Sequence, residues 1–409
     1  MSSAESRLAE TVRAEGARIL ATLVRVFGDL HIAEDAVQEA TVRALRQWPV
    51  TGIPSSPRAW LTVTARRAAI DTLRREGARS AKERAAMDLH LDDDPTEDAI
   101  NDDLLRLIFT CAHPALSLDA QVTLALRVLC GLSATQIAAV LLSSESAVAK
   151  RLTRTRAKIA RAGIPYRVPT TAELPQRLSA VCNVVYTLYT SAHTAAEGRD
   201  LSDVDGSREG VRLARLVYTL MPDEVAPMAV LSLLLLTEAR REARIDADGN
   251  PIVLAEQDRT VWDSDAIEEG CRLLNASLRR SGGIADPYQL QAAIAATHAI
   301  APSYRETDWA EIVRLYDLLI EVYPSPAARL ARVVAAAENS GVGNGLAQLA
   351  DIEPDHRWHA VRAELLARDH RFAEAIDEMS ASLAGPGSVS EAEAGHRRRL
   401  IARWTQGLQ

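Results

Sequence analysis

Residues 131–161 read GLSATQIAAVLLSSESAVAKRLTRTRAKIAR, and this stretch decides the fold of the region around it. Ser133 and Gln136 have the spacing of a capping box that begins a short helix after Gly131. Ser144 can cap a second, longer helix after a brief turn. Two helices joined in this way are typical of a helix-turn-helix.

The longer helix has two chemically different faces. Val148 and Leu152 share an apolar face at helical spacing, whereas basic residues gather on another face. In a helix-turn-helix bound to DNA, the start of this helix reaches base edges. The residues placed there are Ser146, Ala147, Lys150 and Arg151. Arg154 and Lys158 lie further along and are expected to contact phosphates. The alternative is an amphipathic helix whose basic face only meets water.

The rest of the chain is also predicted to be helical. Almost every segment repeats apolar residues at helical spacing, and glycine and proline fall between the repeats, so we predict an all-α protein. The length of 409 residues exceeds what one hydrophobic core usually organises. The expected parts are a first helical domain (1–78), an acidic flexible linker (79–103), a helix-turn-helix domain (104–168) and a C-terminal helical extension (169–409). Paired helices with short breaks in the extension favour a tetratricopeptide-like stack.

Charge is distributed unevenly along the chain. Residues 1–168 hold 23 Lys and Arg against 20 Asp and Glu, a net charge of +3, whereas residues 169–409 hold 24 against 35, a net charge of −11. Two basic clusters, 58–84 and 150–167, favour two contacts with a polyanion. The acidic extension is expected to face a different partner.

Composition and motifs argue against several classes of protein. The four cysteines are widely spaced and lack a Cys-x-x-Cys pattern, which suits reduced thiols and argues against a zinc site. The start of the chain lacks the layout of a signal peptide, and the most apolar run, 226–236, is too short to cross a bilayer. We therefore expect a soluble, cytoplasmic protein with no membrane contact. No phosphate-binding loop or catalytic constellation stands out, so we expect no enzyme and no cofactor.

Two helices before the linker form a second signal. The helix at 31–48 is expected to bury one side, which comprises Ala36, Val37, Ala40, Ala44, Leu45 and Trp48. Its other side exposes Asp35, Gln38, Glu39 and Arg46. The next helix, at 57–76, is strongly basic and contains Trp60. Taken alone, the first of these is an ordinary surface helix.

The order of these parts resembles the extracytoplasmic-function group of sigma factors (sigma-70 family, group IV). The stretches that match are 33–40 (AEDAVQEA), 57–61 (PRAWL), 69–75 (AIDTLRR) and 144–152 (SESAVAKRL). Other stretches are similar to the subgroup with a long tetratricopeptide-like C-terminal extension, namely 106–116, 162–169, 258–263, 287–294 and 307–309. The resemblance covers nearly the whole chain.

The resemblance implies a role for each motif. Residues expected to dock on the β′ clamp helices of core RNA polymerase are Glu34, Asp35, Gln38 and Glu39, and the β flap is a second expected contact. Residues expected at the −10 element of promoter DNA are Trp60, Arg66, Arg67, Asp71, Arg74 and Arg75. The recognition helix is expected at the −35 element. Arg67, Thr72 and Ala149 depart from residues common in the group, so no base preference is carried over.

In the resembling subgroup the extension regulates the sigma factor. We therefore expect control through an intramolecular contact of the extension or through an unknown regulatory protein. Two alternatives stay open. One is an ordinary helix-turn-helix regulator with a ligand-binding helical domain, which binds promoter DNA without polymerase. The other is a tetratricopeptide-like scaffold whose front domains are adaptors. The helix at 35–39 separates them, because a simple regulator has no use for a polymerase-docking surface.

A few polar residues of the extension have two interpretations. His356 and His359 lie three residues apart, but no acidic or cysteine pattern completes a metal site, so a structural role is expected. Four further residues either line a pocket or hydrogen-bond between helices, and the second interpretation is favoured: Tyr288, Gln289, Gln291 and His298.

Overall fold

The computed structural model describes residues 3–75, 97–141, 143–196, 206–246, 252–283, 285–384 and 391–407. Within these ranges the protein consists of helices and their connections and has no β-strand, which confirms the all-α prediction. The chain forms two compact units, Met1–Leu188 and Tyr189–Gln409.

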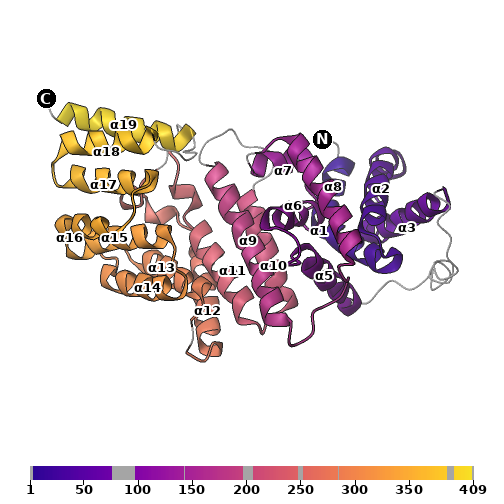
Figure 1. Ribbon diagram of the computed structural model, residues 1–409. Helices are drawn as coiled ribbons and strands as arrows, with labels where there is room; N and C mark the ends of the chain where they lie inside the picture. The colour runs from indigo at the N-terminus through magenta and orange to yellow at the C-terminus, as the bar shows by residue number, and fades with distance from the viewer. Residues whose placement is uncertain are drawn as a thin grey trace. The chain divides into compact units, whose positions relative to one another are not determined.

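The first unit begins with three helices that pack on one another (Figure 1), α1 (Ser3–Phe27), α2 (Leu30–Thr51) and α3 (Pro57–Arg75). Many buried positions of α2 and α3 are alanine, so the helix backbones approach closely there; the fully buried alanines of the three helices are Ala21, Ala33, Ala40, Ala44, Ala65 and Ala69. The indole of Trp48 fills the space between α2 and α3 and lies 5.6 Å, centroid to centroid, from Trp60.

The buried side of α2 is narrower than the sequence predicts. Leu45 was expected in the core, but 47% of its surface is exposed. The small side chains of Ala40 and Ala44 already bring the neighbouring helices close to the backbone of α2. Leu45 instead follows Gln38 and Val42 at helical spacing and therefore lies with them on the exposed side of α2.

Among the described residues of the first unit, the next helices are α5 (Glu97–Cys111), α6 (Leu118–Val128), α7 (Ala134–Val140) and α8 (Glu145–Ala162). The capping box of Ser133 and Gln136 is present, and Ser144 accepts the backbone N–H of Ala147. The C-terminal end of α8 is Gly163, whose φ of 59° is readily adopted by glycine. The predicted helix-turn-helix is thus formed by α7 and α8.

Two predicted boundaries differ from the observed elements. The acidic linker was placed at 79–103, but α5 already begins at Glu97, and residues 79–96 lie outside the described residues. The first turns of α5 are held by Asp103, whose buried carboxylate pairs with an arginine of α1. The helix α9 (Leu174–Ala196) continues the first compact unit to Leu188, beyond the expected boundary at 168.

The second unit is a succession of helices in which neighbours in sequence pack together (Figure 1). The α-helices are α10 (Gly206–Leu220), α11 (Val225–Glu238), α12 (Ser264–Arg280), α13 (Pro287–Ile300), α14 (Trp309–Val322), α15 (Pro326–Ser340), α16 (Val342–Gln348), α17 (His356–Arg368), α18 (Phe372–Ala384) and α19 (Glu391–Gly407). Short 3₁₀ turns are η1 (Arg241–Ala243), η2 (Leu254–Glu256), η3 (Arg259–Val261) and η4 (Leu349–Asp351).

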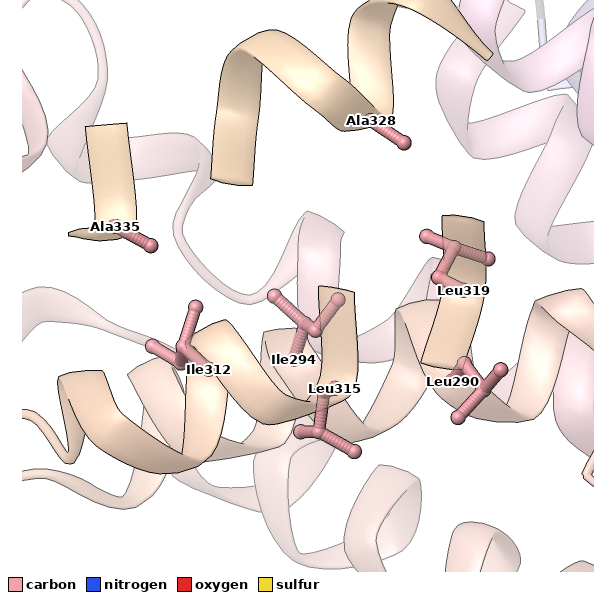
Figure 2. Packing of buried hydrophobic residues seen from close by; sticks show 7 residues of the cluster. All are labelled: Leu290, Ile294, Ile312, Leu315, Leu319, Ala328 and Ala335. Atoms are coloured by element: carbon pink, nitrogen blue, oxygen red, sulfur yellow. The ribbon is translucent and has the colours of Figure 1, made fainter. Parts of the chain in front are cut away.

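The core of this unit consists of successive hydrophobic clusters, and neighbouring clusters share a helix. Figure 2 shows one section, in which α13, α14 and α15 contribute Leu290, Ile294, Ile312, Leu315, Leu319, Ala328 and Ala335. Further along, α11 and α12 cross so closely that a Cβ on Gly270 would lie 2.7 Å from Cγ of Leu236. Helices stacked in this way resemble a repeat architecture. The tetratricopeptide-like nature of the repeats stays a prediction.

Candidate nucleic-acid and polymerase interfaces

The exposed face of α8 presents the cations that the sequence assigned to DNA. Ser146, Lys150, Arg154 and Lys158 are all exposed. Val148 and Leu152 are buried against the rest of the helix-turn-helix, and Thr135 of α7 donates to the Glu145 carboxylate at 3.0 Å. The packed face therefore fixes the direction in which the basic face points.

Two arginines of α8 bind partners within the chain and therefore do not belong to the exposed basic face. Arg151, a predicted base-reading residue, donates from Nη1 to Oγ1 of the buried Thr123 on α6 at 3.0 Å. Arg156, which flanks the basic face, is bound to Glu34 of α2. Ala147 is partly buried near the start of the helix. The exposed reading face in this arrangement is consequently narrower than the sequence predicts.

The basic helix α3 presents a second exposed set of charges. Arg67, Asp71 and Arg74 are exposed, and Arg74 lies 3.9 Å from Asp71. Trp60 and Arg66 are partly buried, with the Trp60 ring packed edge-on against Trp48. Arg75 ends the helix, and its side chain lies outside the described residues. The two basic helices thus belong to two different helical groups of the same unit.

The exposed side of α2 forms one continuous stripe. The residues along it are Asp35, Gln38, Glu39, Val42, Leu45 and Arg46, which recur at helical spacing. Val42 is 39% exposed, and Glu39 pairs with Arg43 at 3.0 Å. We call this set the α2 stripe. It combines apolar and charged side chains, as protein interfaces do.

Glu34 does not lie on the α2 stripe. It was expected on the exposed side of α2, but only 5% of its surface is exposed. Arg156 donates from Nε and Nη2 to both carboxylate oxygens at 2.9 Å, and Nε of Arg127, at the end of α6, lies 3.3 Å from Oε1. The prediction that Glu34 is exposed is wrong for this arrangement. A buried carboxylate is stable only when it is paired, and the two arginines provide that pairing.

A second buried carboxylate also joins α1–α3 to α5–α8, but here the acid lies on α5 and the arginine on α1. Asp103 of α5 is 1% exposed, and its Oδ2 accepts from Nε of Arg25 on α1 at 2.8 Å. Burial raises the pKa of Asp103, and Arg25 and Arg106 oppose that rise. The hydroxyl of Tyr166 lies 2.9 Å from the carbonyl oxygens of Ala21 and Asp103. Sequence reasoning missed this set because its members are spread from residue 21 to residue 166.

We call Glu34, Arg127, Arg156, Arg25 and Asp103 the interdomain lock. Glu34 belongs to α1–α3 and its two arginines to α5–α8. Asp103 belongs to α5–α8 and Arg25 to α1–α3. The pKa of the Cys111 thiol is raised, first by burial and next by the negative charge of Glu34. The lock holds α1–α3 against α5–α8 within the first unit.

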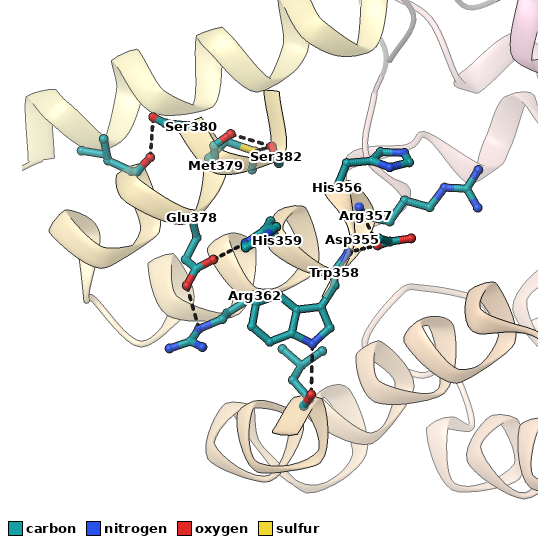
Figure 3. Close-up of polar contacts among 12 residues, drawn as sticks. Asp355, His356, Arg357, Trp358, His359, Arg362, Glu378, Met379, Ser380 and Ser382 are labelled. Atoms are coloured by element: carbon teal, nitrogen blue, oxygen red, sulfur yellow. Dashed lines mark hydrogen bonds and ion pairs between the residues drawn. The ribbon is translucent and has the colours of Figure 1, made fainter. Parts of the chain in front are cut away.

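The candidate residues of the extension separate into different roles. His359 Nδ1 lies 2.6 Å from Glu378 Oε2 and Arg362 pairs with the same carboxylate, which ties α17 to α18 (Figure 3). Gln289 forms a capping box with Asp286 and donates to Ser277 Oγ at 3.1 Å. Gln291 donates to the carbonyl oxygen of Pro287 within its own helix. His298 packs against Trp309, with ring centroids 5.2 Å apart.

No group of three or more His, Cys, Asp or Glu side chains in the described part of the chain has the arrangement to hold a metal ion. No described helix is both long and apolar enough to span a bilayer.

Three stretches of the chain match models of known protein families. Residues 11–79 match sigma-70 region 2, and residues 106–159 match sigma-70 region 4. Residues 177–278 match a family of unknown function (DUF6596). The two sigma-70 domains support a sigma-factor role in promoter recognition and transcription initiation.

One relative matches this chain over most of its length. An uncharacterized protein of Rhizobium meliloti is 38% identical over 388 residues, which cover 91% of this chain and 90% of the relative. The chain belongs to the same family as that protein. Because the match covers 91% of this chain, it includes most of the C-terminal extension.

Proposed function

We propose that this sigma factor docks on core RNA polymerase through the α2 stripe, contacts the −10 element with α3 and reads the −35 element with α8. The observation that supports it is the presence of two separately exposed basic helices in one unit, next to a mixed apolar and polar stripe. In this proposal the protein acts in the cytoplasm and opens promoter DNA by binding it, without covalent chemistry.

The α2 stripe has the composition of a docking surface. Val42 and Leu45 are large apolar side chains that remain exposed, and Asp35, Gln38 and Glu39 adjoin them. Interfaces commonly bury an apolar centre inside a polar rim. The β′ clamp helices are the partner that the family resemblance assigns to this stripe, and the β flap is the proposed contact of the helix-turn-helix group.

The DNA contacts follow from the exposed cations. Lys150, Arg154 and Lys158 reach away from the packed face of α8, where they can contact bases and phosphates of duplex DNA. On α3, Arg67 and Arg74 are proposed to hold the DNA strands near the −10 element, with Trp60 close by. Arg66, Asp71 and Arg75 complete that set.

We propose that the interdomain lock holds a closed form of the first unit. Glu34 adjoins the α2 stripe but is covered by Arg127 and Arg156. Full access to this end of α2 therefore requires α2 to part from α6 and α8. We assign the function of the C-terminal extension to the control of this opening, either by its own contacts or through a regulatory protein, and its net charge of −11 suits contacts with basic residues.

Co-purification with core polymerase, followed by run-off transcription, tests the docking assignment. Glu39→Arg reverses a charge on the α2 stripe and is expected to reduce both polymerase binding and transcript. Glu10→Arg is the matched control, because Glu10 is also exposed and pairs with a nearby arginine on α1. Equal binding by both variants would remove the α2 stripe as the docking surface. Promoter binding without any polymerase association would favour the simple regulator.

A truncation tests the regulatory assignment. Because α9 belongs to the first unit up to Leu188, the chain is shortened after residue 196 and not at residue 170. A regulatory extension predicts a changed transcript yield from the shortened chain at equal polymerase concentration. An unchanged yield would contradict it.

A further inference from the structure

The second unit contains a group of cations around one tryptophan. Arg240 and Arg244 flank η1, Arg259 begins η3, and Trp262 and His298 lie between them. The Cζ atom of Arg259 lies 4.7 Å from the Trp262 ring centroid, and that of Arg240 lies 5.9 Å from it. We call these five residues the arginine–tryptophan cluster.

Two of the three arginines have structural tasks. Arg259 donates from Nη1 to the carbonyl oxygens of His298 and Ala301, each at 2.6 Å, and so holds the C-terminal end of α13. Arg244 donates from Nη2 to the carbonyl oxygen of Thr237, near the end of α11. These bonds satisfy free carbonyl groups at the ends of helices. They also bring two positive charges to the vicinity of Arg240.

Arg240 differs from its neighbours. Its partly buried guanidinium packs on Trp262, and among the described residues it has neither a hydrogen-bond acceptor nor an acidic partner. The acid closest in sequence, Glu238, is bound to Arg241 and to the hydroxyl of Tyr189. A guanidinium withdrawn from water usually has a carboxylate or phosphate against it.

The electrostatic setting of Arg240 is unfavourable without an anion. Burial, and next the charge of Arg244, lower the pKa of Arg240 to about 10. Burial, followed by Arg240 and Arg259, lowers the pKa of His298 to about 4, so the imidazole is neutral at pH 7. The cluster thus concentrates positive charge on arginines that remain protonated, and the neutral histidine adds none.

Two buried nitrogens in the same cluster have no hydrogen-bond partner among the residues that the structure describes. They are Nε1 of Trp262, a residue that is 7% exposed, and Nδ1 of His298. The indole N–H can only donate, and a neutral imidazole nitrogen can donate or accept according to its tautomer. An oxyanion has enough lone pairs to accept from a guanidinium and from an indole N–H together.

We propose that the arginine–tryptophan cluster binds a small molecule that carries an oxyanion, either a phosphate or a carboxylate group, with the guanidinium of Arg240 as its main donor. The indole N–H of Trp262 is the second donor. A small ligand is favoured over a protein segment because the donor on Trp262 is buried. Binding of this ligand to the extension does not depend on the role in transcription that we propose for the extension.

Thermal shift and calorimetry on the full chain test this proposal. The probes are sodium phosphate and sodium succinate, each compared with sodium chloride at equal ionic strength. Either probe is expected to raise the melting temperature of the wild-type chain, and the stronger of the two identifies the oxyanion. Arg240→Gln is expected to weaken that binding by about tenfold or more, the value of a lost charged hydrogen bond.

Matched variants separate a binding role from a structural one. Arg314→Gln, which removes an exposed arginine of α14 outside the cluster, should leave the affinity unchanged. Without added anion, Arg240→Gln should melt no lower than the wild-type chain, because it removes an uncompensated charge. Arg240→Lys keeps the charge and should recover part of the affinity. Bound phosphate should also raise the pKa of His298, measured from its imidazole NMR signals.

Several results would overturn the proposal. Equal shifts with phosphate, succinate and chloride would show only ionic screening. Equal shifts in the wild-type chain and in Arg240→Gln would place the anion elsewhere. A large loss of stability in Arg240→Gln without anion would assign Arg240 to the fold. Binding of an acidic peptide but of neither small anion would indicate a protein segment as the occupant.

Discussion

Two clusters of buried charge in this protein differ in how completely they are neutralised. In the first unit, Glu34 is held by two arginines and Asp103 by Arg25. In the second unit, Arg240 has two arginines nearby and no described acid. A charge paired within the chain stabilises one arrangement of its own domains. An unpaired charge leaves an interaction for something outside the chain. The contrast assigns a conformational role to the first cluster and a binding role to the second.

Removal of Glu34 should have the largest effect on stability. Glu34→Ala leaves Arg127 and Arg156 without their anion, and breaking a buried ion pair costs about 3–5 kcal/mol. Since both arginines can regain some water, a loss of about 3 kcal/mol is expected. Hydrogen exchange of α2 and α8 amides measures it. Asp35→Ala, at the adjacent exposed carboxylate, should cost less than about 1 kcal/mol. Similar losses in the two variants would mean that Glu34 is not locked.

Arg156 and Lys150 should separate the lock from the DNA contact, although both are cations of α8. Lys150→Ala is expected to weaken binding of promoter DNA by about 1–3 kcal/mol, the usual value of a base contact, and to leave hydrogen exchange of α2 unchanged. Arg156→Ala should instead increase exchange in α2 and increase association with polymerase, because it favours the open form. Promoter affinity is measured on the polymerase complex at fixed salt. A uniform effect of both substitutions would contradict the division of α8 into two faces.

The smallest expected effect is a pH dependence in the second unit. The pKa of His298 is about 4 in the folded chain and 6.5 in its ordinary state, so the unfolded chain binds more protons between these values. The contribution of the neutral imidazole to the free energy of unfolding is fully present above pH 6.5 and is lost as the pH falls towards 4. Between pH 7 and pH 5.5 this amounts to about 1 kcal/mol at about 1.4 kcal/mol per pH unit. Urea unfolding of the wild-type chain and of His298→Gln at the two pH values measures the difference.

Phosphate gives that last experiment a second use. An anion beside Arg240 offsets the positive charge that acts on His298, so saturating phosphate should reduce the pH dependence of the wild-type chain. His298→Gln should show little change with phosphate. If phosphate leaves the pH dependence of the wild-type chain as it was, the anion does not sit beside this histidine.

Local patterns in the sequence predicted the helix-turn-helix well. The capping residues Ser133 and Ser144 lie where the sequence places them because caps are decided by neighbours within a few residues. The same holds for the end of α8 at Gly163. The spacing of apolar residues also identified the packed face of α8, since helical periodicity alone decides which residues share a side.

Partners distant in the chain were not predictable in this way. Glu34 and Asp35 are adjacent acids in one motif, and only packing distinguishes the buried one from the exposed one. Arg151 and Arg156 belong to the basic stretch of α8, but their partners lie on α6 and α2. The sequence offered two interpretations of His298, but it gave no indication of the charges that surround this residue. The importance of Arg240 was missed because an arginine at the end of a helix is ordinary until its surroundings are known.

The sequence by itself determined the helical class, the order of the parts, the caps of the helix-turn-helix and the basic faces, because each depends on residues near one another along the chain. The tertiary structure alone decided which charges are used internally and which remain for partners. That choice depends on burial, and the free energy of a buried charge is set by groups that the fold brings from far along the chain.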